Sequence, residues 1–357
     1  MKRYRFPVLK SAARVVLALL VAIGVWALVA CGGGSNNGTG EPGTFVFNSD
    51  NMVEAAGEGV LAITVWEEVS EFLVLIVELL EPDQEVEALS RDFRLTPLQM
   101  TQPLPCLDDT GSATLTYDDV LADNTKATLS FDQCKIDPDP EYLILDGELV
   151  LRVGSYNAEP ESGAPFLQGS LAIDLSVDEF LDGERSQSAL KTGATRTVPL
   201  QAFREANSIA FRYGFGLPDV LLTIQQTEPK QARVEFGCFN VRIDAIEEDG
   251  DLRLTRTDGY SAIVVDNLGF SVSGALDFEM FQGEPVPREG RLEYRSDLGR
   301  GPCPAVRAPE GITPAPTAMR MFPAPEAPFM VLELYPNGFS QPKNDASEKV
   351  INWFDID

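Results

Sequence analysis

The chain has 357 residues, of which 55 are acidic, 28 are basic and none is histidine, so its formal net charge is −27. A charge of this sign repels nucleic acid and anionic lipid surfaces, and we expect neither as a partner. The lack of histidine excludes histidine-based catalytic triads and histidine metal ligands.

The first 30 residues have the pattern of a secretory signal. Five basic residues precede Val15, and residues 15–30 form an apolar run that only Gly24 interrupts. A basic start, an apolar centre and small residues at the end are the parts of an export signal, and this run is short for a membrane span. We expect residues 1–30 to be cleaved off.

The signal ends in Leu28-Val29-Ala30-Cys31, which resembles the lipobox of bacterial lipoproteins. The resemblance implies cleavage before Cys31, diacylglycerol on its sulfur, and often a further acyl chain such as palmitate on the new amine. Two or three acyl chains make a stable membrane anchor. In the best-known sorting system aspartate after the cysteine implies retention at the inner membrane, so Gly32 favours the outer membrane. The alternative is an uncleaved anchor helix with an incidental cysteine.

A tether follows the cysteine. Residues 31–44 contain six glycines and no large apolar side chain, so we expect a flexible linker between bilayer and domain. Removal of residues 1–30 leaves 23 basic and 55 acidic residues, a formal charge of −32.

Four cysteines remain beyond Cys31, namely Cys106, Cys134, Cys238 and Cys303. An even number in an exported domain indicates two disulfides. Three pairings satisfy this number, and we favour Cys106–Cys134 with Cys238–Cys303. None of the four has CxxC spacing, and without histidine no mixed zinc site forms, so redox catalysis and structural zinc are not expected.

One long amphipathic helix is predicted over about residues 51–81. Asn48-Ser49-Asp50 supplies capping residues at its start, and Glu67, Glu71 and Glu78 are placed on its polar side. The apolar positions recur at steps of three and four residues: Val65, Val69, Phe72, Leu73, Ile76, Leu79 and Leu80. A buried strand over residues 60–66 is the alternative.

The remaining sequence predicts strands. A Gly-x-Leu-x-apolar pattern begins at Gly147, Gly169, Gly250, Gly274 and Gly290, and we interpret each glycine as a turn before a strand. Residues 239–244 and 252–254 are expected to form a hairpin across residues 247–250. Such pairing favours antiparallel β-structure with one face in water.

Towards the C-terminus the pattern is interrupted and then resumes. Residues 301–328 contain eight prolines and predict an irregular connection that Cys303 holds to the domain. Residues 329–335 return to a strand pattern with a turn at Pro336-Asn337-Gly338, and the apolar residues 350–354 are expected to dock on the body.

The predicted fold class is mainly β: a large antiparallel sheet, as a sandwich or an open half-barrel, with one long N-terminal helix. Residues 45–357 form one exported domain or two intimate halves, 45–190 and 200–357, joined by a polar segment over residues 183–208.

Short motifs for catalysis and metal binding are weak. Ser188-Ala189-Leu190-Lys191, Lys191-Thr192-Gly193 and Ser49-Asp50-Asn51 match fragments found in serine acyl-enzymes, but their order along the chain contradicts that family. Calcium is a minor alternative at three carboxylate clusters, which we interpret first as solvated turns: Asp118, Asp119 and Asp123; Asp137, Asp139 and Glu141; and Glu247, Glu248, Asp249 and Asp251. We therefore expect no catalytic residue, metal or cofactor.

The assembled features are similar to β-rich secreted lipoproteins of Gram-negative bacteria that have no agreed activity. The leading hypothesis is a non-enzymatic lipoprotein, bound to the membrane through Cys31, with an interaction or structural role and an envelope protein as partner. The second is a carrier or sensor of an apolar, lipid-like ligand held between sheet and helix, and the third is a carboxylate-based glycan hydrolase.

Overall fold

The computed structural model describes residues 43–80, 100–118, 121–136, 142–181, 184–193, 197–205, 208–215, 221–228, 232–248, 251–265, 268–281, 284–296, 317–339 and 346–356. All structural statements below concern these residues. The predicted signal, Cys31 and most of the tether lie outside them, as does the proline-rich connection up to residue 316.

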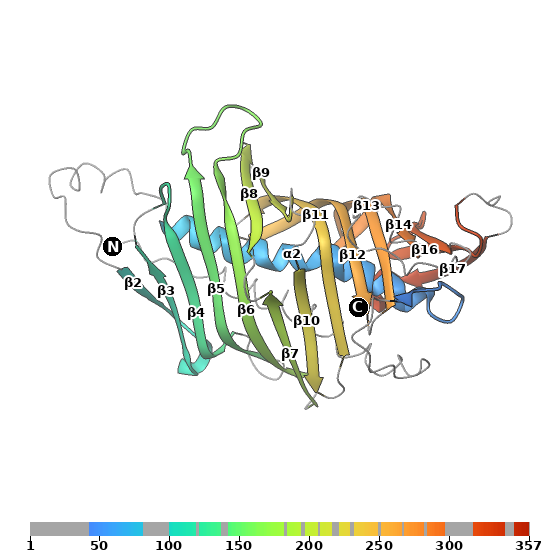
Figure 1. Ribbon diagram of the computed structural model, residues 1–357, viewed down its shortest axis with the longest axis horizontal. Helices are drawn as coiled ribbons and strands as arrows, with labels where there is room; N and C mark the ends of the chain where they lie inside the picture. Colours follow the sequence, from blue (N-terminus) through green and yellow to red (C-terminus); the bar gives the residue numbers. More distant parts are fainter. Residues whose placement is uncertain are drawn as a thin grey trace.

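The described elements are one α-helix, two short 3₁₀ helices and seventeen strands (Figure 1). Their order begins β1 (Gly43–Thr44), α2 (Met52–Leu80), β2 (Met100–Leu104), η1 (Leu107–Asp109), β3 (Ser112–Tyr117), β4 (Lys126–Lys135), β5 (Tyr142–Tyr156), β6 (Leu167–Leu181), β7 (Glu184–Thr192) and β8 (Val198–Glu205). It continues β9 (Ser208–Tyr213), β10 (Leu221–Glu228), β11 (Ala232–Glu248), β12 (Asp251–Val265), β13 (Leu268–Phe281), β14 (Glu284–Arg295), β15 (Ala318–Pro323), β16 (Phe329–Tyr335), β17 (Ser347–Asn352) and η3 (Trp353–Asp355).

All seventeen strands belong to one sheet. Each long strand pairs antiparallel with the next one along the chain, and the short β1, which joins β13, is the one parallel pairing. The predicted β11–β12 hairpin forms, but its partners differ from the prediction. Residues 252–254 pair with Glu247, Ile246 and Ala245, and residues 240–244 pair further along β12, with Asn240 opposite Tyr260 and Asp244 opposite Arg256. The prediction of a mainly β, antiparallel fold with one helix is confirmed, and its single sheet is open: β2 and β17 lie at opposite ends of the molecule (Figure 1).

The middle of the sheet is built from short strands placed end to end. The long β6 pairs along one half with β7 and along the other with β8. β10 continues the sheet from β7, β9 continues it from β8, and both then pair with β11. The prediction of a polar connection over residues 183–208 is therefore wrong: the segment includes β7 and β8, whose pairing on two sides supplies the order that the local sequence pattern does not show.

Helix α2 begins as its capping residues predict. The Asn48 side chain accepts the backbone N–H groups of Asp50 and Asn51, and the Asn51 side chain accepts that of Asn48. The first helical hydrogen bond follows, from the Ala55 N–H to the Asn51 carbonyl. The side-chain bonds hold the turn directly before the helix, and one of them satisfies the N–H of Asn51, the residue that precedes Met52. The alternative of a strand over residues 60–66 is thus excluded.

The part of the helix from Val69 to Val77 is buried on all sides. Every residue from Val69 to Val77 is buried, and nine consecutive helical positions pass more than twice around the axis. Glu71 is 4% exposed, so the expectation that it lies on a solvent-facing side is wrong. A helix enclosed in this way is a core element rather than a surface helix.

The length of α2 matches the width of the sheet. Its 29 residues span about 43 Å. The sheet from β4 to β14 has eight strand-to-strand spacings, or about 38 Å. The ring of Phe72 meets Phe131 of β4, while Tyr294 of β14 bonds to Ala56 in the first turns. The helix thus crosses the strands and joins both halves of the chain into one buried core (Figure 1).

Four of the five repeated glycines do not mark turns, and the fifth, Gly250, lies outside the described residues. Gly147, Gly169, Gly274 and Gly290 lie inside β5, β6, β13 and β14. A Cβ atom on Gly147 would lie 2.1 Å from the Asp174 carbonyl oxygen of the neighbouring strand, and its φ is +113°. The pattern located strands correctly, but each of these glycines permits a close backbone approach within a long strand.

The end of the chain follows the prediction in part. The irregular connection predicted over residues 301–328 is wrong at its end, because residues 318–323 form β15, which pairs with β14 and β16. Of the residues 350–354 expected to dock on the body, Val350 is 61% and Phe354 39% exposed. Residues 329–335 form β16, Gly338 turns with a φ of +76°, and Trp353 is buried against Phe278. Among the described residues no helix combines the length and apolar character needed to cross a bilayer.

Helix and sheet approach closely at Gly59, where a Cβ atom would stand 2.1 Å from Cε1 of Tyr294. We expect Gly59→Ala to lower the free energy of unfolding by about 1–3 kcal/mol because the ring must move, despite the better helix propensity of alanine. Gly193→Ala is the matched control, since nothing lies within 4 Å of its added methyl group. Urea unfolding measures both; equal stability of the two variants would contradict the contact.

Candidate functional site

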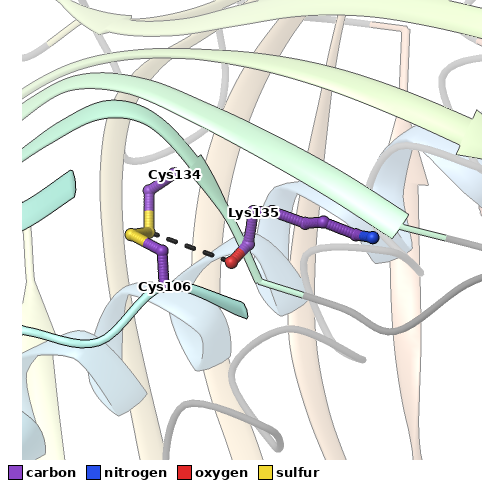
Figure 2. Close-up of a disulfide and its surroundings, with 3 residues drawn as sticks. All are labelled: Cys106, Cys134 and Lys135. Carbon is purple, nitrogen blue, oxygen red and sulfur yellow. Dashed lines mark hydrogen bonds between the residues drawn. A yellow bond between two sulfur atoms is a disulfide. The ribbon is translucent and has the colours of Figure 1, made fainter. Parts of the chain in front are cut away.

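The first disulfide joins Cys106 and Cys134, with Cα atoms 5.4 Å apart (Figure 2). It ties the segment after β2 to the end of β4. Beside it, the Lys135 ammonium lies 2.8 Å from Asp108 and 4.6 Å from the ring centre of Tyr142. This half of the predicted cysteine pairing is confirmed.

Cys238 is also disulfide-bonded. It is buried in a β-bulge of β11 and packs with Ala262 and Tyr260, apart from the main core. Its partner lies outside the described residues, as do Cys31 and Cys303. The pairing of Cys238 with Cys303 therefore stays a prediction.

Peptide mapping under non-reducing conditions is expected to give Cys106–Cys134 and Cys238–Cys303. The double variant Cys106→Ser/Cys134→Ser should lose about 3–4 kcal/mol of unfolding free energy, because the bond closes a loop of 28 residues in the unfolded chain. A Cys31–Cys238 peptide in the map would overturn both this pairing and the assignment of Cys31 as the lipid site.

The interface between α2 and the sheet is where the carrier hypothesis places an apolar ligand. At its centre the Trp66 ring stacks on Tyr213 of β9, with centroids 4.6 Å apart, and meets Phe239 of β11 at 4.7 Å. The Ser70 hydroxyl is 2.6 Å from the Tyr213 hydroxyl and donates to the Trp66 carbonyl. These rings are fully buried.

A second tyrosine fixes the first turns of the helix. The Tyr294 hydroxyl donates to the Ala56 carbonyl over 3.0 Å, and the ring lies over Gly59. Burial raises the pKa of both Tyr294 and Tyr213 far above the ordinary value, in Tyr213 against a smaller opposing effect of the Ser70 hydrogen bond. The interface is thus held by two neutral phenols inside an aromatic and aliphatic core.

These raised pKa values predict loss of stability in alkali. An unfolded tyrosine ionises with a pKa of about 10, so the contribution of each buried phenol is complete below that pH and declines above it. Above pH 10 the free energy of unfolding should fall by about 1.4 kcal/mol per pH unit for each buried tyrosine. Tyr213→Phe and Tyr294→Phe should each flatten this fall; a slope unchanged in both would show that neither phenol is held neutral.

The acyl-enzyme motif does not assemble. Ser188 faces the core from β7, whereas Lys191, three residues further along the strand, is exposed and lies 2.7 Å from Asp174. Positions three apart in a strand point to opposite faces. Ser49 and Asn51 take part in the turn before α2. The order of motifs and the geometry therefore both argue against a serine–lysine pair.

The described carboxylates of the proposed calcium clusters have structural partners. Asp118 accepts the Lys126 N–H and Asp123 accepts the Tyr156 N–H, each over 2.7 Å. No group of three carboxylate or cysteine side chains in the described ranges is arranged to hold a metal ion. Asp119, Asp137, Asp139, Glu141 and Asp249 lie outside those ranges, and the side chains of Glu247, Glu248 and Asp251 are not described.

The outer face of the sheet carries many ion pairs. Arg185 bonds to Asp178, Arg242 to Asp244, Arg256 to Asp277, and Arg320 to Glu293, at distances of 2.6–3.2 Å. The carboxylate of Asp277 raises the pKa of Arg256. Exposed pairs of this kind each contribute about 0–1 kcal/mol. Their main effect is to pair basic side chains of the outer face with neighbouring carboxylates.

Comparison with known proteins finds no matching family model, no matching curated protein and no matching solved structure. The functional interpretation therefore depends on the residues themselves.

Sequence reasoning missed the Trp66–Ser70–Tyr213 contact, although the spacing of four residues between Trp66 and Ser70 places them on one helix face.

Proposed function

We propose that this chain is an envelope lipoprotein, held in the outer membrane by lipid on Cys31, whose β domain has a non-enzymatic interaction or structural role. One observation supports this role for the domain. Helix α2 packs on the inner face of the sheet, and Trp66 and Tyr213 are fully buried between helix and sheet. The surfaces left to a partner are the outer face and the sheet edges.

The cysteine pairing supports the anchor. Cys106, Cys134 and Cys238 are in disulfides, which leaves one partner to be supplied by Cys31 or Cys303. Whichever of Cys31 and Cys303 does not pair with Cys238 has a sulfur atom that can carry a lipid. Because the lipobox surrounds Cys31, we assign the lipid to Cys31 and the second disulfide to Cys303.

The interface geometry favours an interaction role over a carrier. An apolar ligand between helix and sheet would have to separate Trp66 from Tyr213 and break the hydrogen bonds made by Tyr213 and Tyr294. Burial of large side chains stabilises this contact by about 1.5–3 kcal/mol each. Opening it for a ligand would therefore cost much of the stability of the domain.

Replacement of Cys31 tests the anchor. We expect the wild-type chain to sediment with outer membranes and Cys31→Ser to move into the soluble fraction, because the variant lacks the atom that carries the diacylglycerol. Ser35→Ala, in the same tether, is the matched control and should stay with the membrane. Immunoblots of fractions from a density gradient measure all three.

Two outcomes would contradict the proposal. Membrane retention of Cys31→Ser would show that lipid on this sulfur is not the anchor. Wild-type chain in inner-membrane fractions would leave the anchor intact but refute the location.

A further inference from the structure

Strand β17 forms an open edge of the sheet. Its six residues pair with β16 in unbroken register, from Phe329 opposite Asn352 to Leu334 opposite Ser347. Within the described chain no strand pairs with its other side, and Ser347 to Val350 are all exposed. An edge strand offers a row of backbone N–H and C=O groups to an incoming strand.

The opposite edge is blocked in ways that β17 is not. Strand β2 has five residues, and one of them, Pro103, has no N–H to offer. Its end is also tied back by the disulfide of Cys106. β17 contains neither proline nor glycine and has no bulge. The two edges therefore differ in their capacity to accept a strand.

An apolar row leads across the outer face to the β17 edge. Phe322 of β15 lies opposite Val331 of β16, which lies opposite Val350 of β17. Val350 is 61% exposed, the highest value among the exposed large apolar residues, and Phe329, two positions from Val331, is 40% exposed. A side chain placed opposite Val350 would extend this row by one position and cover it.

The neighbouring rows define the charge of an incoming strand. Glu348 ends the row that runs from Arg320 through Glu333, whereas Lys349 and Ile351 point to the other face of the sheet. Residues directly opposite each other share a face and interact as pairs. A complementary strand thus carries a basic residue opposite Glu348, an acidic one opposite Lys349, and apolar ones opposite Val350 and Ile351.

We propose that the β17 edge is a docking site for an extended segment of a partner protein, which adds to the sheet as an antiparallel strand with apolar-apolar-acidic-basic order. This inference deepens the interaction role given above. Its chemistry is strand addition: main-chain hydrogen bonds provide affinity, and alternate side chains provide specificity. Strand β17 has a different order from N- to C-terminus, acidic-basic-apolar-apolar in Glu348-Lys349-Val350-Ile351, so a second copy of β17 is not the complementary strand.

The probe is the synthetic peptide Thr-Val-Val-Glu-Lys-Thr with a fluorescent label and capped ends. Read from its N-terminus, it lies opposite Asn352 through Ser347. We expect it to bind the purified full chain in fluorescence anisotropy. The peptide Thr-Glu-Val-Lys-Val-Thr has the same composition in another order and should bind at least about fivefold more weakly, since each mismatched cross-strand pair loses up to about 1 kcal/mol.

Variants of the chain locate the site. Val350→Asp should weaken binding about fivefold, and Glu348→Lys about two- to fivefold. A peptide with glutamate in place of its lysine should regain affinity for Glu348→Lys. Met100→Asp, at an exposed apolar position of β2, is the matched control and should leave binding unchanged. Near-ultraviolet circular dichroism checks that every variant keeps its fold.

A peptide methylated on alternate backbone nitrogens distinguishes strand addition from side-chain contact and should not bind. Absence of binding by the first peptide, equal binding by the reordered one, or insensitivity to Val350→Asp would overturn the proposal. A dimer of the full chain in native mass spectrometry that Val350→Asp abolishes would assign the edge to a second copy instead. None of these results depends on the lipid at Cys31, so failure here and failure of the anchor are separate outcomes.

Discussion

The packing of α2 against a single sheet is the constraint on which the rest of the structure depends. Nine consecutive residues of the helix are buried, and strands from β4 to β14 contact it through Phe131, Tyr213 and Tyr294. The contact is close where Tyr294 lies over Gly59, and a second contact forms where Trp66 stacks on Tyr213. These two points fix the position of the helix along and across the strands.

Glycines and β-bulges allow the long strands of this sheet to bend. Strands of 14–17 residues, such as β11, β12 and β13, accumulate twist along their length. Facing glycines at Gly259 and Gly274 and the bulges in β11 allow neighbouring backbones to approach and bend. The same curvature leaves one face to the helix and the other to the ion pairs.

This division of faces bears on function. Apolar burial is concentrated inside, where the tyrosine hydroxyls bond to the helix, and charge is concentrated outside, where basic residues pair with carboxylates. Under the proposed interaction role, the outer face and the sheet edges are the surfaces left for recognition. The contrast between Pro103 in β2 and the unbroken pairing of β17 makes one edge the better candidate for a partner.

The sequence by itself determined the fold class, the helix start near Asn48–Asn51, the presence of the β11–β12 hairpin and strand 329–335, because each depends on local periodicity, capping or turn chemistry. It favoured Cys106–Cys134 among three possible pairings, and the structure decided for that pair. Only the tertiary structure decided that Glu71 is buried, that residues 183–208 include paired strands and that Gly147 lies inside a strand rather than at a turn. It also separated Ser188 from Lys191 and exposed Val350 at a sheet edge. Each of these features depends on which strand, distant in the sequence, pairs or packs with the residue. Local sequence patterns do not predict such non-local contacts.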